Sequence, residues 1–119
     1  MRLAIPLCGD DVAPRFCSAA HVLIVDVADG REVRRERVAL PAGAIPERLL
    51  ALRALGVTDL LCGGFNRTFR PLAEGLGMRL SWRLLGPADA VVDALLAGAP
   101  LPVGPVCPRP FTSDPKDPS

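Results

Sequence analysis

The stretch IPLCGDDVAPRFCSAAHVLIVDV, residues 5–27, places a polar loop between two apolar runs. The runs, residues 2–7 and 20–27, are mainly aliphatic and predict two buried strands. Glycine and proline punctuate the segment between them, which predicts a loop rather than a helix. Cysteines stand near its two ends, at Cys8 and Cys17. We therefore expect this loop to form part of a functional site.

The residues after this stretch continue an alternation of strand and helix patterns. An Asp-Gly turn at residues 29–30 joins the second strand to an alternating run, which predicts a β-hairpin. Apolar residues at helical spacing then predict three helices, and short apolar runs predict two more strands. The third to fifth expected strands cover residues 31–39, 57–62 and 78–82, and the expected helices cover residues 45–55, 67–76 and 88–97.

The order of these elements, β-β-β-α-β-α-β-α, predicts an α/β fold with a five-stranded mixed sheet and three helices. The hairpin gives an antiparallel half, and the helical crossovers give a parallel half. The expected strand order is 3-2-1-4-5, with strands 1, 4 and 5 parallel. The chain leaves the carboxyl ends of strands 1 and 4 in opposite directions. Open sheets bind ligands at such a topological switch point.

Length and composition fit one small domain followed by a tail. The chain has 119 residues, which favours a single domain. Seven of the last twenty residues are proline, so neither a helix nor an inner strand is expected there. We therefore expect a folded domain over residues 1–99 and an extended or disordered Pro-rich tail over residues 100–119.

Charge and hydropathy restrict the classes of partner. The formal net charge is +1, so no overall field attracts nucleic acid. No apolar run approaches the roughly 20 residues that span a bilayer, and no secretory signal pattern is visible. We therefore expect a cytoplasmic protein that binds neither nucleic acid nor membrane. In that compartment cysteines are more often reduced, metal-bound or buried than joined in disulfides.

Three cysteines belong to segments that meet at the switch point. Cys8 ends the first strand and Cys62 ends the fourth, so the expected topology places them side by side. Cys17 stands at the far end of the loop that leaves the first strand. The spacing lacks a zinc signature, because there is no C-x2-C pair and only one histidine. Converging thiolates suit an iron–sulfur or related cluster, and simple core packing is the alternative.

Two further residues are weaker ligand candidates. Cys107 lies in the Pro-rich tail, which can fold over the crevice and complete a four-cysteine set, or bridge two protomers around a shared cluster. The alternative is a mobile tail with an incidental cysteine. His21 begins the second strand, where a packed or hydrogen-bonded histidine is the more common arrangement. The pattern leaves a homodimer open.

The loop after the fourth strand has features that suit an anion. Gly63 and Gly64 permit close approach of a backbone, and either Asn66 or Thr68 can cap the helix that follows. Arg15 and Arg67 flank the same crevice. These residues suit an anionic cluster, and a phosphate or nucleotide would also fit. A solvated rim is the alternative for the two arginines.

The sequence resembles a known family over residues 1–99. VAPRFCSAAHVLIVDVADG, residues 12–30, resembles the VSPHFGRAPYFLIVDVEDG-like segment of the dinitrogenase iron–molybdenum cofactor biosynthesis family. LGVTDLLCGGFN, residues 55–66, resembles the LGVDVVICGGIG-like segment of that family, and DAVVDALLAG, residues 89–98, resembles its last helix. The resemblance implies a ribonuclease-H-like fold. It also implies a small protein that binds, stores or carries iron–sulfur or molybdenum-containing cluster precursors.

Three positions depart from the family pattern. Arg15 stands where the family has histidine, and Cys17 and Asn66 stand where it has glycine. A candidate imidazole contact is thus replaced, and a thiol appears two residues later. The resemblance implies a function without catalysis, with metallocluster donor and acceptor proteins as partners.

Other functions on the same fold remain to be weighed. A thiol redox or regulatory module without a bound cluster is the main alternative, because a thiol near a helix N-terminus can have a lowered pKa. Nuclease activity is disfavoured, because the centres of the first and fourth strands carry Ala4-Ile5 and Leu60-Leu61 instead of metal-binding carboxylates.

Overall fold

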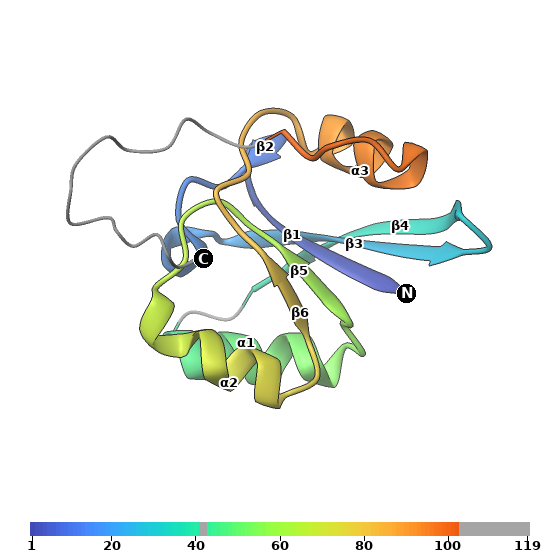
Figure 1. The fold of residues 1–119 in the computed structure, drawn as a ribbon. Helices are drawn as coiled ribbons and strands as arrows, with labels where there is room; N and C mark the ends of the chain where they lie inside the picture. Colours follow the sequence, from blue (N-terminus) through green and yellow to red (C-terminus); the bar gives the residue numbers. More distant parts are fainter. Residues whose placement is uncertain (41–42, 103–119) are drawn as a thin grey trace.

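The computed structural model describes residues 1–40 and 43–102. The chain forms, in order, β1 (Arg2–Cys8), β2 (Asp11–Val12), the 3₁₀ turn η1 (Phe16–Ser18), β3 (His21–Ala28), β4 (Arg31–Ala39), α1 (Ile45–Ala54), β5 (Asp59–Leu61), the 3₁₀ turn η2 (Arg67–Phe69), α2 (Arg70–Gly75), β6 (Arg79–Ser81) and α3 (Ala88–Ala97). The sheet is the middle layer, with α1 and α2 on one side and α3 on the other (Figure 1).

The sheet has the predicted strand order. Its strands follow one another as β4-β3-β1-β5-β6, and β2 pairs with β1 off this path. β1, β3 and β4 are antiparallel neighbours, whereas β1, β5 and β6 are parallel neighbours. The predicted α/β class, mixed sheet and three helices are confirmed. The switch point between β1 and β5 is therefore present.

The segment expected as one loop, residues 8–19, contains two short elements. Gly9 has a positive φ of 65°, which lets the chain reverse directly after β1. As a result Cys8 pairs with Asp11, and the short strand β2 forms. The turn η1 follows. The sequence did not indicate β2, because two residues are too few to show a strand period.

The second helix is shorter than expected, because its first turn is the 3₁₀ turn η2. Asn66 caps this turn, as predicted: its side-chain oxygen accepts a hydrogen bond from the Thr68 amide at 3.0 Å. Pro71 lies in the first turn of α2, where its missing N–H costs nothing.

Two apolar clusters lie on opposite faces of the sheet. The α1-side core includes Leu49 and Leu52 of α1 and Ala73 of α2. The α3-side core includes Val91 and Val92 of α3. Successive strand residues alternate between the two clusters, as a pleated strand buried on both faces requires.

The described chain ends against the fold. Leu101 packs on the α3-side core, and the amide of Leu85 donates to the carbonyl of Pro102 at 3.0 Å. The predicted tail residues from 103 onward lie outside the described residues. Among the residues that are described, no helix is both long and apolar enough to cross a membrane.

Candidate functional site

Three loops meet at the carboxyl ends of β1, β5 and β6 (Figure 1). The amide of Phe16 donates to the carbonyl of Gly64 at 2.9 Å, which joins the loop after β1 to the loop after β5. The amide of Arg83 donates to the carbonyl of Gly63 at 2.9 Å, which adds the loop after β6. The predicted switch point is thus a surface built from three loops that are distant in sequence.

Gly63 and Gly64 make this meeting sterically possible. A Cβ atom on Gly63 would lie 2.3 Å from the carbonyl oxygen of Ala13, and one on Gly64 would lie 2.7 Å from that of Pro14. No side chain fits at such distances. We call this backbone contact between residues 13–16 and residues 63–64 the loop seam. The backbone that approaches these glycines belongs to the protein itself, and their predicted role in cofactor binding stays a prediction.

Two thiols are accessible at the edge of this surface. Cys8 is the last residue of β1 and Cys17 lies in the middle of η1, and both are free and exposed. Phe16 beside Cys17 is buried, and its ring lies 5.5 Å from that of Phe65 in the loop after β5. The loop that carries Cys17 is therefore anchored by an aromatic contact next to the thiol.

Cys62 lies in a different environment. It follows β5, has no exposed surface and belongs to the α1-side core. Burial raises the pKa of its thiol to about 12, because an apolar surrounding disfavours the thiolate. Its backbone continues the sheet edge, since its amide donates to Ser81 and its carbonyl accepts from Leu84. In the protein without a bound ligand this thiol is neutral.

The ligand candidates within the described residues do not form a ready metal site. Residues 1–40 and 43–102 contain no group of three or more His, Cys, Asp or Glu side chains arranged to hold a metal ion. Cys8, Cys17 and Cys62 therefore do not form a ready three-thiol site there. His21 is exposed and pairs with Leu7 in the sheet. Cys107 lies outside the described residues, so its predicted ligation is not tested.

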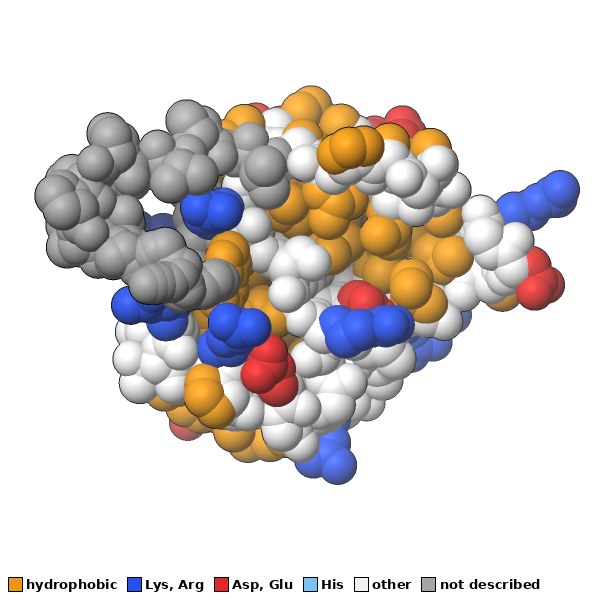
Figure 2. Space-filling model, viewed as in Figure 1, with side chains coloured by type: hydrophobic (Ala, Val, Ile, Leu, Met, Phe, Trp, Pro, Cys, Tyr) orange, Lys and Arg blue, Asp and Glu red, His pale blue; other side chains and the backbone are white. Residues whose placement is uncertain are grey.

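Arginines surround the three loops. Arg15 is exposed and forms a parallel bridge with Gly64, and Arg67 is exposed at the start of η2. Arg70 stacks on the Trp82 ring with its guanidinium carbon 5.0 Å from the ring centroid. Figure 2 shows basic side chains gathered on this part of the surface. Arg70 is also paired with Glu74, so the positive charge that suits an anion comes mainly from Arg15, although the whole chain is close to neutral.

Two residues of this region were not singled out from the sequence. Arg83 directly follows the last strand-like run, so the rule that placed the other loops at the carboxyl edge could have found it. It adopts a positive φ of 63°, unusual for a residue with a side chain, and is exposed. Arg48 lies three residues after Ile45 and one before Leu49, on the apolar stripe of α1. A charged residue on such an apolar stripe is the sequence signal that could have identified Arg48.

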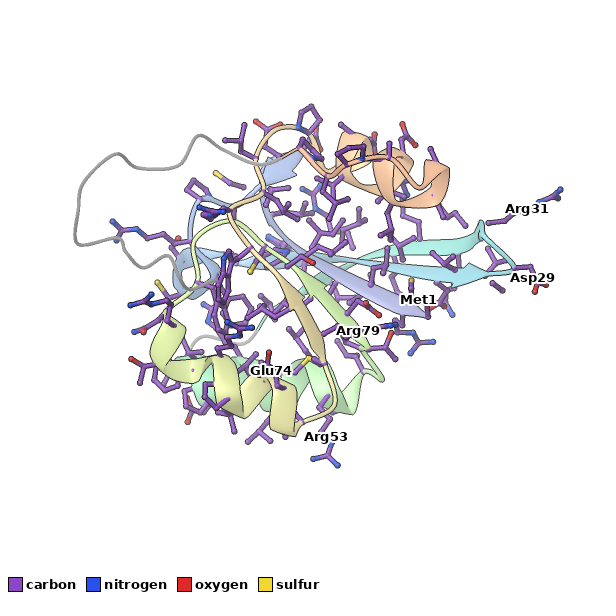
Figure 3. The ribbon with its side chains drawn as sticks, viewed as in Figure 1. Met1, Asp29, Arg31, Arg53, Glu74 and Arg79 are labelled. Carbon is purple, nitrogen blue, oxygen red and sulfur yellow. The ribbon has the colours of Figure 1, made fainter. Side chains whose placement is uncertain are left out.

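An apolar groove lies at the opposite end of the molecule. Its volume is about 550 Å³, and it is lined by Met1, Asp29 and residues of β3 and α3. Figure 3 places Met1, Asp29 and Arg31 at this end, away from the three loops. The groove contains none of the predicted site residues and is not part of the candidate site.

Comparison with known proteins identifies relatives of the fold. No protein-family model matches the chain, and no curated protein matches it. Among solved structures, the protein PH0822 is 23% identical with a TM-score of 0.81, and the alignment covers 87% of this chain and 94% of that one. The chain shares this fold.

Two further structures carry informative names. The apo form of the orange protein from Desulfovibrio gigas is 27% identical with a TM-score of 0.68, covering 89% of this chain and 96% of that one. A protein of Methanocaldococcus jannaschii, provisionally named a dinitrogenase, is 14% identical with a TM-score of 0.64, covering 82% and 89% of the two chains. One of these neighbours is thus named for dinitrogenase, and the other is named the orange protein. The ribonuclease-H-like label stays a prediction.

Proposed function

We propose that this protein binds, stores or delivers an iron–sulfur or molybdenum-containing cluster precursor during metallocofactor assembly, and that it acts without catalysis. The observation that carries the proposal is the pair of exposed thiols at the switch-point side of the sheet, Cys8 at the end of β1 and Cys17 in the loop that follows this strand. Thiolates are the usual protein ligands of iron–sulfur clusters. The names of the structural neighbours and the resemblance to the dinitrogenase cofactor biosynthesis family support the same function.

The charge at the three loops supports this assignment. Clusters with thiolate and sulfide ligands are commonly anionic. Arg15 is exposed on the loop that carries Cys17, and Arg83 is exposed on the loop after β6. Arginine is weakly hydrated and has a fixed fork of donors, which suits contact with a bulky anion. A cluster seated here would be bound by two thiolates and surrounded by guanidinium groups.

Two thiolates do not complete the coordination of a common cluster. The other positions are left to Cys107, to His21, to a second copy of the chain or to a donor or acceptor protein. Partial coordination fits delivery, because an exposed cluster held by few ligands can be passed to an acceptor. A cytoplasmic location and a homodimer remain part of the proposal.

Cys62 enters the proposal as a conditional ligand. Its thiol would have to lose a proton and reach the surface, and burial opposes both steps. Metal binding can supply the free energy for deprotonation, because a metal-bound thiol is a thiolate. Cys62 is therefore a ligand only if cluster binding rearranges the end of β5.

The test is anaerobic reconstitution with iron and sulfide, with and without molybdate, followed by metal analysis and an absorption spectrum. The wild-type protein should take up metal and develop charge-transfer bands. Cys8→Ser and Cys17→Ser should each lower the metal content while leaving the circular dichroism spectrum unchanged. Cys62→Ala is the matched comparison, since full metal content in this variant assigns Cys62 to the core alone. A colourless wild-type protein without metal would reject the proposal.

One observation favours a second function. Two free, exposed thiols, one at the end of β1 and one in the loop after it, also suit a thiol redox module of this fold without a cluster. That function predicts a reversible change of thiol titre with oxidation in protein that binds no metal. The same samples decide between the two functions when thiols are titrated before and after mild oxidation.

A further inference from the structure

Arg48 is the only charged side chain that is buried among residues 1–40 and 43–102, with 7% of it exposed. It lies on α1, with buried Leu49 and Leu52 on the same helix. Burying a guanidinium is costly unless its donors find acceptors. The guanidinium at this position therefore needs hydrogen-bond acceptors around it, whereas an apolar side chain would need none.

The partners of Arg48 are all backbone carbonyls. Its Nη1 donates to the carbonyl of Ala19 and, at 3.5 Å, to that of Phe16. Its Nε lies 3.5 Å from the carbonyl of Gly43. Phe16 and Ala19 lie on either side of Cys17. One side chain of α1 thus contacts both ends of the turn that carries the thiol.

The turn η1 has little support of its own. Its internal hydrogen bonds are long. The Ser18 amide lies 3.3 Å and the Ser18 hydroxyl 3.2 Å from the carbonyl oxygen of Arg15, and the Ala19 amide lies 3.4 Å from that of Phe16. No side chain caps its N-terminus. A turn of three residues with such bonds is marginal without tertiary contacts. Its entry is held at the loop seam by Phe16, and its exit is held by Arg48.

We propose that Arg48 is the positioning residue for Cys17. By binding the carbonyls of Phe16 and Ala19, it holds η1 in one conformation, so that the thiol is presented at the carboxyl edge before any ligand arrives. Arg48 does not touch the ligand. The proposal rests on the proposed function for the statement that Cys17 is a ligand, but the ordering of the turn can be measured without a cluster.

The first experiment measures amide hydrogen exchange by NMR in the full chain without cluster. Arg48→Met keeps much of the apolar volume and removes every donor. Because the carbonyl of Ala19 loses its hydrogen bond to a charged group and the turn opens more easily, the amide of Ala19 should exchange about tenfold faster or more. Amides of β1 and β3 should keep their rates. Arg53→Met is the matched control, because Arg53 is exposed on the same helix and should leave Ala19 unchanged.

Arg48→Lys separates hydrogen bonding from volume. The ammonium can donate to the carbonyl of Ala19, but lysine has a methylene group where arginine has Nε, so the donor to the carbonyl of Gly43 is lost. Exchange at Ala19 should therefore lie between the rates of the wild type and Arg48→Met. If Arg48→Met does not fold, the exchange rate in Arg48→Lys alone tests the proposal. An Ala19 amide that exchanges at the wild-type rate in Arg48→Met, or in Arg48→Lys where Arg48→Met does not fold, would overturn the proposal.

The second experiment measures the rate of cluster loss to a chelator from reconstituted protein. Arg48→Met should lose the cluster about tenfold faster, since a looser turn holds its thiolate less tightly. If exchange at Ala19 rises but cluster loss does not, the positioning role is overturned. If the wild type takes up no cluster, the proposed function falls, and the exchange rates alone decide whether Arg48 orders the Cys17 turn.

Discussion

Cys62 lies at the end of β5 with no exposed surface, among apolar side chains between the sheet and the helices α1 and α2. In a pleated strand it faces the same side as Leu60, and that side is covered. The thiol therefore occupies a place where charge is disfavoured. Its chemistry in the folded chain differs from that of the exposed thiols of Cys8 and Cys17.

This difference predicts a stability change in alkali. The pKa of the Cys62 thiol is raised from 9.0 to about 12 on folding, so the folded state favours the neutral form. The contribution is fully present below pH 9 and is lost as the pH rises toward 12. The wild type should lose stability relative to Cys62→Ala over that range, by up to roughly tenfold in the folding constant per pH unit.

Urea unfolding at several pH values between 8 and 11 measures the effect. The chain has no tyrosine and one lysine, so phenol groups are absent and ammonium side chains contribute little to the pH dependence in this range. Cys8→Ala is the control, because its thiol is exposed and should leave the pH dependence as it is in the wild type. Parallel pH dependences for wild type and Cys62→Ala would contradict the prediction.

Residue patterns located the accessible thiols but not their environment. Cys8 and Cys17 stand beside loop-forming residues, so the sequence alone indicated a place at a loop. Whether Cys62 is a ligand or a core residue depends on what covers one face of β5, and that is set by α1 and α2. The role of Arg48 depends on carbonyls about 30 residues earlier in the chain. Such contacts have no local signature.

At the scale of elements, the loop seam connects the loop after β1 to the loop after β5. The strand and helix patterns of the sequence show these two loops only as separate segments. Two backbone hydrogen bonds join the two sides of the loop seam. The amide of Phe16 donates to the carbonyl of Gly64, and the amide of Gly64 donates to the carbonyl of Pro14. The loop after β1 thus runs beside the end of β5 almost as an additional strand. The close fit between backbones requires residues without a Cβ atom.

Gly63→Ala should therefore destabilise the protein. The added methyl group would lie 2.3 Å from the carbonyl oxygen of Ala13, and a backbone atom cannot move aside as a flexible side chain can. Overpacking of this kind costs roughly 1–3 kcal/mol. The measurement is the urea midpoint, together with hydrogen exchange of the Phe16 amide, which reports whether its hydrogen bond to the carbonyl of Gly64 is kept.

Gly75→Ala is the control, because nothing lies within 4 Å of its Cβ position at the end of α2. This substitution should be neutral or slightly stabilising, since alanine restricts the unfolded chain. Equal stability of the two variants would show that the loop seam is not tightly packed.

The sequence indicated the five main strands and the three helices, and it missed β2 and η1. The hairpin and the helices are set by local periodicity and by turn residues, which lie within the elements themselves. β2 and η1 are set instead by contacts with other loops, such as the hydrogen bond from Val12 to Gly86. These two elements build the candidate site, so the site was predicted less completely than the fold.

For the whole molecule, the folded part reaches beyond the last helix. Leu101 packs on the α3-side core and Pro102 accepts a hydrogen bond from Leu85, although the composition placed the start of the tail at residue 100. A chain cut after Pro102 should therefore keep its unfolding midpoint. A chain cut after Gly98 should lose roughly 1–2 kcal/mol, from an apolar contact and a hydrogen bond.

Urea unfolding of both shortened chains tests this, with circular dichroism to compare their secondary structure. The pair is matched, because both lack residues 103–119. A large loss in the chain cut after Pro102 would contradict the prediction and would show that later residues support the domain.

The loop seam also bears on the order of events during folding. The bridge between Arg15 and Gly64 joins positions 49 residues apart, and it lies just beyond the pairing of β1 with β5. Contacts between residues far apart in the sequence form after local ones, because closing the long loop between them costs chain entropy before the contact can stabilise the fold. The hairpin of β3 and β4 can form early, whereas the turn that presents Cys17 waits for the parallel half of the sheet. A nascent or partly folded chain therefore has its thiols but not their arrangement, and metal added at that stage meets a flexible peptide in place of a shaped receptor.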